Sequence, residues 1–331
     1  MSILHAGIAT FLKAPYVPPE RGALRAAQAN VAVLGLPFDS TTVTRPGASH
    51  GPRAVRDASS HFAFGSSYHY DYELTLSDYI TLVDCGDIDP VAGNAARTFE
   101  EAGRLLTELY AGGCFPVLIG GDHATTIPGA RALAHQTSGK MGFVMLDTHL
   151  DTAPEIAGET LSHCTPVHRV IDLPNVEGRN VVIIGAHGAA NPRLEQDVAD
   201  RHGITVFTVR QIERMGIEEV ARRALALAGE GTETTYLSVD IDVLDGAFAP
   251  GTCGPEIGGL TGRELVRALE VLGGGRVGAM DVVEVAPMFD PSGCTPRVGA
   301  RVVLDVLAAR ARAGHFGTGT RRGSVRPGVR S

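Results

Sequence analysis

Acidic and imidazole side chains alternate at the end of one apolar segment of the chain. The segment Met141–Leu146 has no polar face, which is typical of a strand buried on both sides in a parallel sheet. It continues directly into Asp147, His149 and Asp151. Because alternate residues of an extended chain point to the same side, we expect these three side chains to leave the strand end together. Unpaired carboxylates beside a buried strand are costly, so the pattern predicts bound cations.

Two further predicted strand ends carry side chains of the same types. Asp240 and Asp242 follow the apolar run 235–239, and His123 follows the turn Gly120-Gly-Asp122. A single Asp-x-Asp or one histidine after a turn is usually structural, but here three groups occupy equivalent positions. Ligands of open α/β sheets bind at the carboxyl ends of the strands. We therefore expect one metal site formed by six residues: His123, Asp147, His149, Asp151, Asp240 and Asp242.

The charges of these six side chains predict two divalent ions. The four aspartates carry four negative charges, and the histidines bind metals as neutral groups. A single zinc ion would use three or four ligands and leave carboxylates unpaired. The set contains no thiolate, which favours Mn²⁺, with Ni²⁺ or Co²⁺ as alternatives. Two ions that share one water lower its pKa and supply hydroxide near neutral pH, so the predicted chemistry is hydrolysis.

Two residues outside the predicted metal site have types that suit a reaction with a cationic substrate. Glu284 follows a further predicted strand, where a carboxylate can hold a planar cation through two hydrogen bonds; the alternative is a surface salt bridge. His163 lies in a polar loop and can donate a proton to a leaving amine, although an isolated histidine is more often structural.

The composition argues against several other classes of protein. The formal net charge is −8, which disfavours general binding to nucleic acid. No uncharged apolar run is long enough to cross a bilayer, and residues 1–9 lack the layout of a signal peptide. The five cysteines are scattered and include Cys164 and Cys253 near the predicted site. They are typical of reduced thiols in a cytoplasmic protein, and small-residue packing is the simpler role for these two.

Strand and helix patterns alternate along the chain, which predicts an α/β fold with one mostly parallel sheet and helices on both faces. The expected strands are 30–36, 80–84, 115–119, 141–146, 181–184, 205–207, 235–239 and 277–280. One expected helix starts near residue 51. The other expected helices span about 95–111, 126–134, 211–228, 262–272 and 297–313. We expect a single domain over 1–331, with an irregular arm at about 1–29 and a flexible tail at about 314–331.

With these residues identified, the sequence resembles the ureohydrolases, the family of arginase and agmatinase. Three motifs carry the resemblance over nearly the whole chain: Gly120-Gly-Asp-His123, Asp147-Thr-His-Leu-Asp151 and Ser238-Val-Asp-Ile-Asp-Val-Leu-Asp245. The loop at 249–260 matches as well, and the pattern is nearest to the agmatinase-like branch. The resemblance implies a three-layer α/β/α fold, two manganese ions, and hydrolysis of a guanidino group to urea and an amine.

The resemblance also implies roles for individual residues. All six predicted metal ligands match the family pattern by position, and Asp151 is expected to be catalytic as well as a ligand. His163 matches the histidine that carries protons, and Glu284 matches the carboxylate that receives the guanidinium. Thr252 and Gly254 are expected to contact the substrate. The family also forms trimers and hexamers, so a homo-oligomer is implied.

The chain departs from the family pattern around the predicted substrate site. The usual T-G-T-P is Thr252-Cys-Gly-Pro255, so Gly254 replaces a threonine whose hydroxyl would lie near the guanidinium. Where the family has H-G-T, this chain has His163-Cys-Thr165. Where the family often has I-G-I-R-G, this chain has Ile184-Gly-Ala-His-Gly188. The loss of side-chain volume at Gly254 predicts a reshaped pocket. We hypothesise that the substrate is guanidine or an N-alkylated guanidine rather than agmatine.

Two other functional classes remain open from the sequence. The first is an inactive metal-binding subunit that supports a catalytic paralogue in a hetero-oligomer; the altered loop around Gly254 favours it weakly, and His163 argues against it. The second is a mononuclear zinc deacetylase on a similar scaffold. The Asp240–Asp242 pair together with His123 favours two metals instead.

Overall fold

The computed structural model describes residues 6–63 and 68–317 of the 331-residue chain. Its centre is an eight-stranded sheet with strand order β4-β1-β5-β10-β9-β6-β7-β8, in which every neighbouring pair is parallel. The strands of this sheet are β1 (Val31–Gly35), β4 (Leu82–Asp87), β5 (Phe115–Ile119), β6 (Lys140–Leu146), β7 (Val181–Ala186), β8 (Thr205–Thr208), β9 (Thr232–Asp240) and β10 (Val277–Val283). A separate antiparallel pair is formed by β2 (Tyr68–His69) and β3 (Leu74–Thr75).

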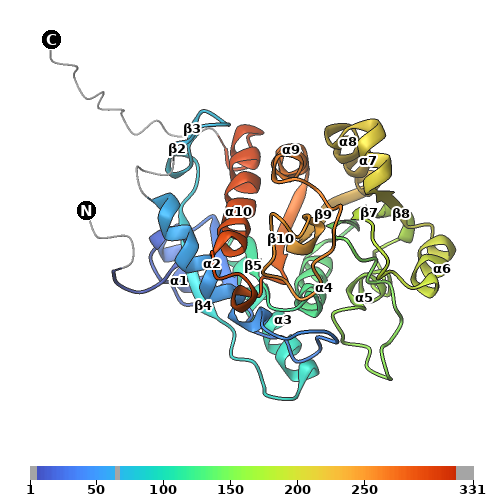
Figure 1. Cartoon of the computed structure of the whole chain (residues 1–331). Coiled ribbons are helices and arrows are strands. Elements are labelled where there is room, and N and C mark those ends of the chain that lie inside the picture. Colours follow the sequence, from blue (N-terminus) through green and yellow to red (C-terminus); the bar gives the residue numbers. More distant parts are fainter. Residues whose placement is uncertain (1–5, 64–67, 318–331) are drawn as a thin grey trace, which may run out of the picture.

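Helices cover both faces of the large sheet, which confirms the predicted three-layer α/β/α fold (Figure 1). One layer contains α2 (Gly51–Ser59), α7 (Val209–Met215), α8 (Ile217–Gly229), α9 (Gly262–Gly273) and α10 (Cys294–Arg312). The other contains α1 (Arg21–Ala26), α3 (Ala95–Ala111), α4 (Thr126–Gln136), α5 (Pro166–Ile171) and α6 (Arg193–His202). None of the described helices is long and apolar enough to span a membrane.

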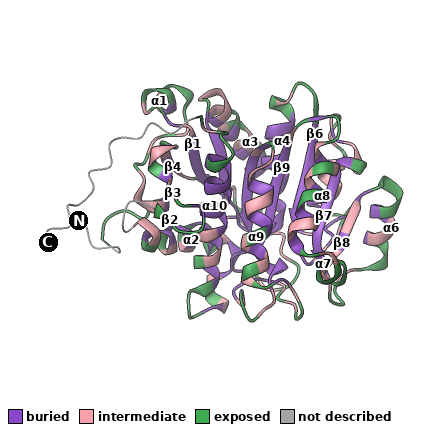
Figure 2. Ribbon diagram, turned by 90° about the horizontal axis from the view of Figure 1, so that it is seen from above, coloured by how far each residue is buried: buried purple, intermediate pink, exposed green. Residues whose placement is uncertain are grey.

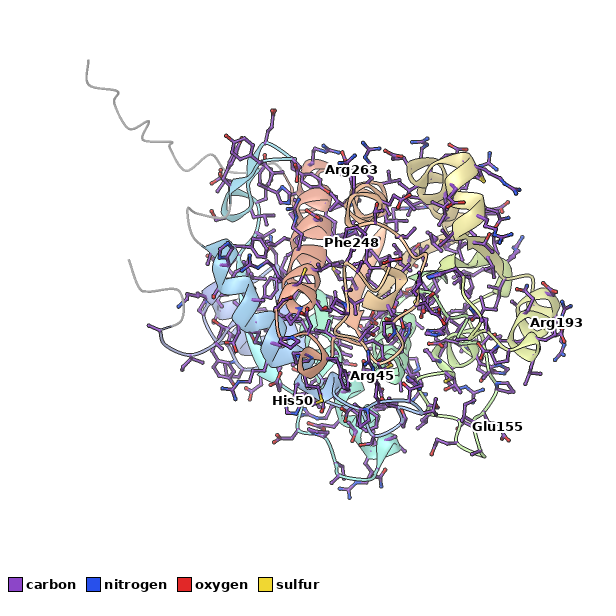
Figure 3. All side chains as sticks on the ribbon, viewed as in Figure 1. Arg45, His50, Glu155, Arg193, Phe248 and Arg263 are labelled. Atoms are coloured by element: carbon purple, nitrogen blue, oxygen red, sulfur yellow. The ribbon has the colours of Figure 1, made fainter. Side chains whose placement is uncertain are left out.

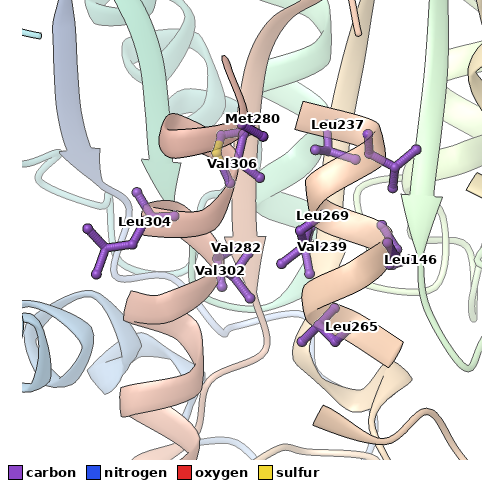
Figure 4. Close-up of a cluster of buried hydrophobic side chains, with 14 of the residues drawn as sticks. Leu146, Leu237, Val239, Leu265, Leu269, Met280, Val282, Val302, Leu304 and Val306 are labelled. Carbon is purple, nitrogen blue, oxygen red and sulfur yellow. The ribbon is translucent and has the colours of Figure 1, made fainter. Parts of the chain in front are cut away.

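The alternation of side chains along each strand divides the core between the two layers. In β1, Val31 and Val33 pack in one hydrophobic cluster, whereas Ala32 and Leu34 pack in another. Both faces of the strands are therefore buried, which explains their uninterrupted apolar runs (Figure 2). On the first face, apolar side chains of α9 and α10 pack on β9 and β10 (Figure 4).

Most of the predicted elements form, and the exceptions have local causes. The predicted helix 211–228 is two helices, because Gly216 between α7 and α8 has the non-helical angles φ 83° and ψ 143°. The arm at 1–29 is not wholly irregular, since its described part contains the 3-10 helix η1 (Phe11–Lys13) and α1. Helices α5 and α6 and the β2–β3 pair were not predicted: α5 and the two strands are short, and α6 is mostly polar, with only Glu195, Val198 and Ala199 buried. Most of the predicted tail, residues 318–331, lies outside the described residues.

The strand order brings together the segments that carry the predicted site residues. Strands β5, β10, β9 and β6 are consecutive neighbours in the middle of the sheet. Because parallel strands end at the same edge, the chain segments that follow these four strands meet there. They contain His123 after β5, Glu284 after β10, Asp240 at the end of β9, and Asp147 after β6.

Candidate metal centre and active site

The imidazole of His123 lies among three carboxylates that come from two strand ends. Its Nδ1 atom is 2.9 Å from Oδ2 of Asp147, 2.9 Å from Oδ2 of Asp151 and 3.0 Å from Oδ2 of Asp240. His123 belongs to the one-turn helix η5 (His123–Thr125), whose N-cap Asp122 accepts a hydrogen bond from the N–H of Ala124. This cap starts the turn that directs His123 towards the carboxylates.

A second set of candidate ligands is formed around His149 and shares Asp147 with the first. The Nδ1 atom of His149 is 3.2 Å from Oδ2 of Asp242 and 3.5 Å from Oδ1 of Asp147. The N–H of Asp242 donates to Oδ1 of Asp240, which leaves Oδ2 of Asp240 directed at His123. Five of the predicted ligands therefore form two adjacent groups that share Asp147, and Asp240 joins the first group through its contact with His123, as a binuclear site requires.

The local reason for this arrangement differs from the one inferred from the sequence. Strand β6 ends at Leu146, so Asp147, His149 and Asp151 lie on an irregular loop and not on an extended strand end. The loop bends back at Asp151, whose φ of 50° is in the left-handed region. Strain of this kind is uncommon for a residue other than glycine and occurs often at functional sites. The three side chains converge because the backbone turns.

Two divalent ions fit the residues present. Nδ1 of His123 and Oδ2 of Asp147 are buried and have no hydrogen-bond partner. Two ligands that bind one ion at right angles, each about 2.1 Å away, lie about 3.0 Å apart, which agrees with the spacing around His123. Burial raises the pKa of Asp242 to about 6, with His149 opposing the rise and Asp147 adding to it, and burial together with Asp242 and Asp147 raises the pKa of Asp240 well above its ordinary value. Cations would relieve this repulsion.

A buried chain of hydrogen bonds fixes the ring of His123 from behind. Nε2 of His123 lies 3.1 Å from Oγ of Ser238, which donates to Oδ1 of Asp281 at 2.7 Å. The other oxygen of Asp281 accepts from the hydroxyls of Thr126 and Tyr236. These contacts favour the proton on Nε2 and leave the lone pair of Nδ1 free to bind a metal. Sequence analysis missed Asp281, although a charged residue inside the apolar strand β10 is itself a signal.

The side chains of Glu284 and His163 contact each other beside the metal ligands. Nδ1 of His163 lies 3.0 Å from Oε1 of Glu284, and that oxygen also accepts from the N–H of His123 at 2.9 Å. Oε2 of Glu284 is buried without a partner. The backbone of Glu284 has φ 62°, a second strained position at the site. Glu284 is 1% exposed, so the surface salt bridge considered as its alternative is excluded.

The loop at 252–254 forms another wall of the site. A Cβ atom at Gly254 would lie 3.0 Å from Cε1 of His149 and 3.5 Å from Oδ2 of Asp242, so this position touches the metal ligands directly. The hydroxyl of Thr252 is buried without a partner. Sγ of Cys253 lies 3.9 Å from Nδ1 of His163, and the thiol of Cys164 also interacts with that histidine. Both cysteines therefore adjoin the predicted proton carrier.

A cavity of about 260 Å³ connects these groups to the surface. Its lining includes candidate ligands, the His163–Glu284 pair, apolar side chains at its mouth, Glu195 of α6 and several small or neutral polar residues. In chain order the lining is Val43, Thr44, His123, His149, Asp151, Ile156, His163, Cys164, Ala190, Asn191, Pro192, Glu195, Asp240, Asp242, Cys253, Gly254 and Glu284. Asp147 and Thr252 lie behind this wall, and Glu195 was not predicted.

Comparison with known proteins relates both the chain and its fold to one family. The arginase family model matches residues 29–309. The guanidinopropionase of Pseudomonas aeruginosa is 35% identical over 309 residues, 91% of each chain, and the agmatinase of Proteus mirabilis is 32% identical over 86% of this chain and 89% of its own. The solved structure of proclavaminate amidino hydrolase from Streptomyces clavuligerus superposes with a TM-score of 0.84 at 34% identity, covering 94% of this chain and all of that one. The chain belongs to the arginase family, the ureohydrolases.

Proposed function

We propose that the protein is a binuclear-metal amidinohydrolase that cleaves a guanidino compound to urea and an amine. One observation carries the proposal: five of the six candidate metal ligands, a buried carboxylate with one free oxygen and a histidine line the same cavity, and the sixth ligand, Asp147, contacts His123 behind its wall. The names of the relatives, guanidinopropionase and agmatinase, support this class of reaction. They give no support to the alternative of an inactive subunit.

The metal ions would be held in two groups. His123, Asp151 and Asp240 would bind one ion, His149 and Asp242 the other, and Asp147 would lie between them. When bound, the two ions supply a hydroxide nucleophile near neutral pH. The oxygen-rich set favours Mn²⁺, with Ni²⁺ and Co²⁺ as alternatives. The two joined groups argue against the mononuclear zinc deacetylase.

The guanidinium would bind at Glu284. Oε1 already accepts two hydrogen bonds, whereas Oε2 is buried and unpartnered, so Oε2 is the oxygen that can accept the substrate N–H groups. Such a charge-assisted bond orients the planar cation next to the candidate ligands. Holding the guanidinium carbon in place lowers the barrier to attack because reactants that are already oriented lose little entropy.

His163 would transfer the proton that the departing amine needs. The N–H of Val43 donates to Nε2 of His163 at 3.0 Å, so the proton of the neutral ring is on Nδ1, which faces Glu284 and the cavity. Burial lowers the pKa of His163, but its side-chain partners, Glu284 included, raise it overall. A histidine held in this way can deliver a proton inside the site.

The substrate would be guanidine or an N-alkylated guanidine rather than agmatine. Support comes from Gly254, which leaves the space beside His149 and Asp242 without a side chain. We also propose that the chain assembles into a trimer or hexamer and works in the cytoplasm. Sedimentation analysis and cell fractionation test these two points.

Urea release tests the proposed reaction. The purified chain is stripped of metal, reloaded separately with Mn²⁺, Ni²⁺ or Co²⁺, and supplied with guanidine, N-alkylguanidines, agmatine and guanidino acids. We expect urea from at least one guanidino compound with at least one metal, and none from the stripped protein. If no compound yields urea with any metal, the proposed function is wrong. If agmatine is clearly the best substrate, only the choice of substrate is wrong.

A further inference from the structure

We propose that the substrate cavity rejects guanidino compounds whose second group is a carboxylate and accepts those whose second group is neutral, and that Glu195 is the residue that determines this selectivity. The proposal rests on the proposed function and adds the class of substrate to it. It is carried by the kinds of side chain that line the cavity beyond the predicted guanidinium position.

Glu195 brings a fifth carboxylate into the cavity wall, in addition to Glu284 and the lining aspartates. It lies in the first turn of α6 and is 6% exposed. Its Oε2 accepts a hydrogen bond from the N–H of Thr152 at 3.3 Å, and its backbone oxygen accepts one from the Thr152 hydroxyl at 2.8 Å. These two bonds hold Glu195 against the loop that carries Asp151. A substrate carboxylate near it would meet a fixed negative charge in a site of low polarity.

The histidines of the described cavity wall already face carboxylates: His123 and His149 face the aspartates, and His163 faces Glu284. Among the described residues that line the cavity, none is a lysine or an arginine. Arg45 is close in sequence to Val43 and Thr44, but its guanidinium donates to the carbonyls of Thr252 and Cys253 and stacks on the ring of Phe289 at 4.1 Å. Its side chain is used to hold the 252–254 loop.

The arginine of α6 that is nearest in sequence to Glu195 is also directed elsewhere. The side chain of Arg193 is 79% exposed and pairs with Asp197 at 2.8 Å, on the outer side of the helix (Figure 3). Glu195, two residues later, points inward to the cavity. Helix α6 therefore directs the carboxylate of Glu195 into the cavity and the guanidinium of Arg193 towards solvent.

The neutral polar donors of the wall already have partners within the protein, and the hydroxyl of Thr44 donates to the carbonyl of Cys253 at 3.2 Å. Asn191 is the lining residue with the most suitable donors, but its amide N–H groups donate to the carbonyls of Thr148 and His187, at 2.9 and 3.1 Å. The remaining neighbours at the mouth, Val43, Ile156, Ala190 and Pro192, are apolar. Two divalent metal ions would add no net attraction, because four aspartates offset their charge. An apolar tail fits this wall, and an anionic tail would lose its hydration without gaining a partner.

A matched pair of compounds tests the proposal on the metal-loaded, full-length protein. 3-Guanidinopropanoate and 3-guanidinopropanamide have nearly the same size and differ in one negative charge. The assay is run at about pH 8.5, because burial raises the pKa of Glu195 to about 7 and the side chain is then ionised. We expect kcat/KM for the amide to exceed that for the acid by on the order of tenfold to a hundredfold. If neither is hydrolysed, their inhibition constants against the best substrate give the same comparison.

The variant Glu195→Gln assigns the effect to this residue. Glutamine keeps an oxygen acceptor for the N–H of Thr152, so the loop contact is preserved. We expect the preference for the amide over the acid to fall by roughly fivefold to tenfold, whereas Asp197→Asn, the same loss of charge on the outer side of α6, leaves the ratio unchanged. An equal or greater rate with the acid in the unmodified protein would overturn the proposal while leaving the proposed function intact. An unchanged ratio in Glu195→Gln would overturn the role of Glu195, and a protein that hydrolyses no guanidino compound would overturn both proposals.

Discussion

The Nδ1 atom of His163 lies 3.0 Å from Oε1 of Glu284, so the predicted proton carrier contacts the carboxylate predicted to receive the substrate. The N–H of Val43 donates to the opposite nitrogen of the ring, which fixes the tautomer. A guanidinium bound to the free oxygen of Glu284 would therefore arrive beside a proton donor whose orientation is already set. The two residues form one functional unit, and each can be tested separately.

Replacement of His163 by glutamine is expected to lower kcat by about 10²- to 10⁴-fold, because the leaving amine loses its proton donor. The metal content should not change, since the closest contacts of His163 are Glu284, Val43 and two cysteines rather than the candidate ligands. Urea release and elemental analysis of the same sample measure both properties. His202→Gln, at the exposed end of α6, is the control. A variant that keeps full kcat would show that the histidine is structural.

Replacement of Glu284 by glutamine is expected to reduce kcat/KM by roughly tenfold to a hundredfold, because a hydrogen bond to a charged acceptor becomes one to a neutral acceptor. Glutamine retains the oxygen that accepts from the N–H of His123, so the position of that ligand should persist. Steady-state kinetics with the best substrate give the ratio, and near-ultraviolet circular dichroism checks the fold. An unaltered kcat/KM would place the guanidinium elsewhere.

Much of this arrangement could be predicted from the sequence because parallel strands end at one edge. The apolar runs identified most strands, and the polar residues immediately after β5, β6, β9 and β10 identified most of the site. The sequence could not give the order of the strands, which places β10 between β5 and β9 and thereby brings Glu284 next to His123. That order depends on long-range packing.

The residues that were missed act through contacts distant in the sequence. Glu195 reaches the cavity only because α6 packs beside the loop after β6. Its hydrogen-bond partner in that loop, Thr152, lies 43 residues earlier in the sequence. Asp281 supports His123 only because Ser238 on the neighbouring strand lies between them. The bend at Asp151 is likewise a property of the folded loop, and no glycine at this position indicates a positive φ in the sequence.

Removal of the support behind His123 is expected to weaken metal binding. In Asp281→Ala, Ser238 loses its acceptor and the hydroxyls of Thr126 and Tyr236 lose theirs, so the ring of His123 is no longer fixed. Loss of such a partner typically costs 10- to 100-fold in metal affinity. Competition with a chelator of known affinity measures the change. The metal affinity of Asp281→Asn, which keeps part of the hydrogen bonding, should lie between that of the unmodified protein and that of Asp281→Ala. Equal affinities in all three proteins would contradict this role.

The buried ion pair of Arg56 with Asp84, which is not part of the cavity lining, is expected to contribute to stability and not to catalysis. Arg56 is 4% exposed and donates to both oxygens of Asp84, at 2.8 and 3.1 Å, and to Asp87. Arg56→Ala leaves the buried Asp84 without its counter-charge, so we expect the free energy of unfolding to fall by about 3–5 kcal/mol. Arg53→Ala, on the exposed side of the same helix, should change it by less than about 0.5 kcal/mol. Urea denaturation of both variants gives these values, and a similar loss in both would indicate that the ion pair is not the cause.

The stabilisation that metals give is expected to increase with pH. Burial and nearby carboxylates raise the pKa of Asp242 to about 6 in the metal-free protein, whereas an unfolded aspartate titrates near 3.9. Between these values the folded protein binds more protons than the unfolded chain, so the stability of the metal-free protein falls as the pH rises. Bound divalent ions favour the ionised carboxylates and remove this loss, because they compete with protons for the same oxygens. Melting temperatures of chelator-treated and Mn²⁺-loaded protein, measured from about pH 4 to pH 6, should therefore diverge as the pH increases. A constant difference across this range would mean that the clustered carboxylates are not the groups that the metal ions neutralise.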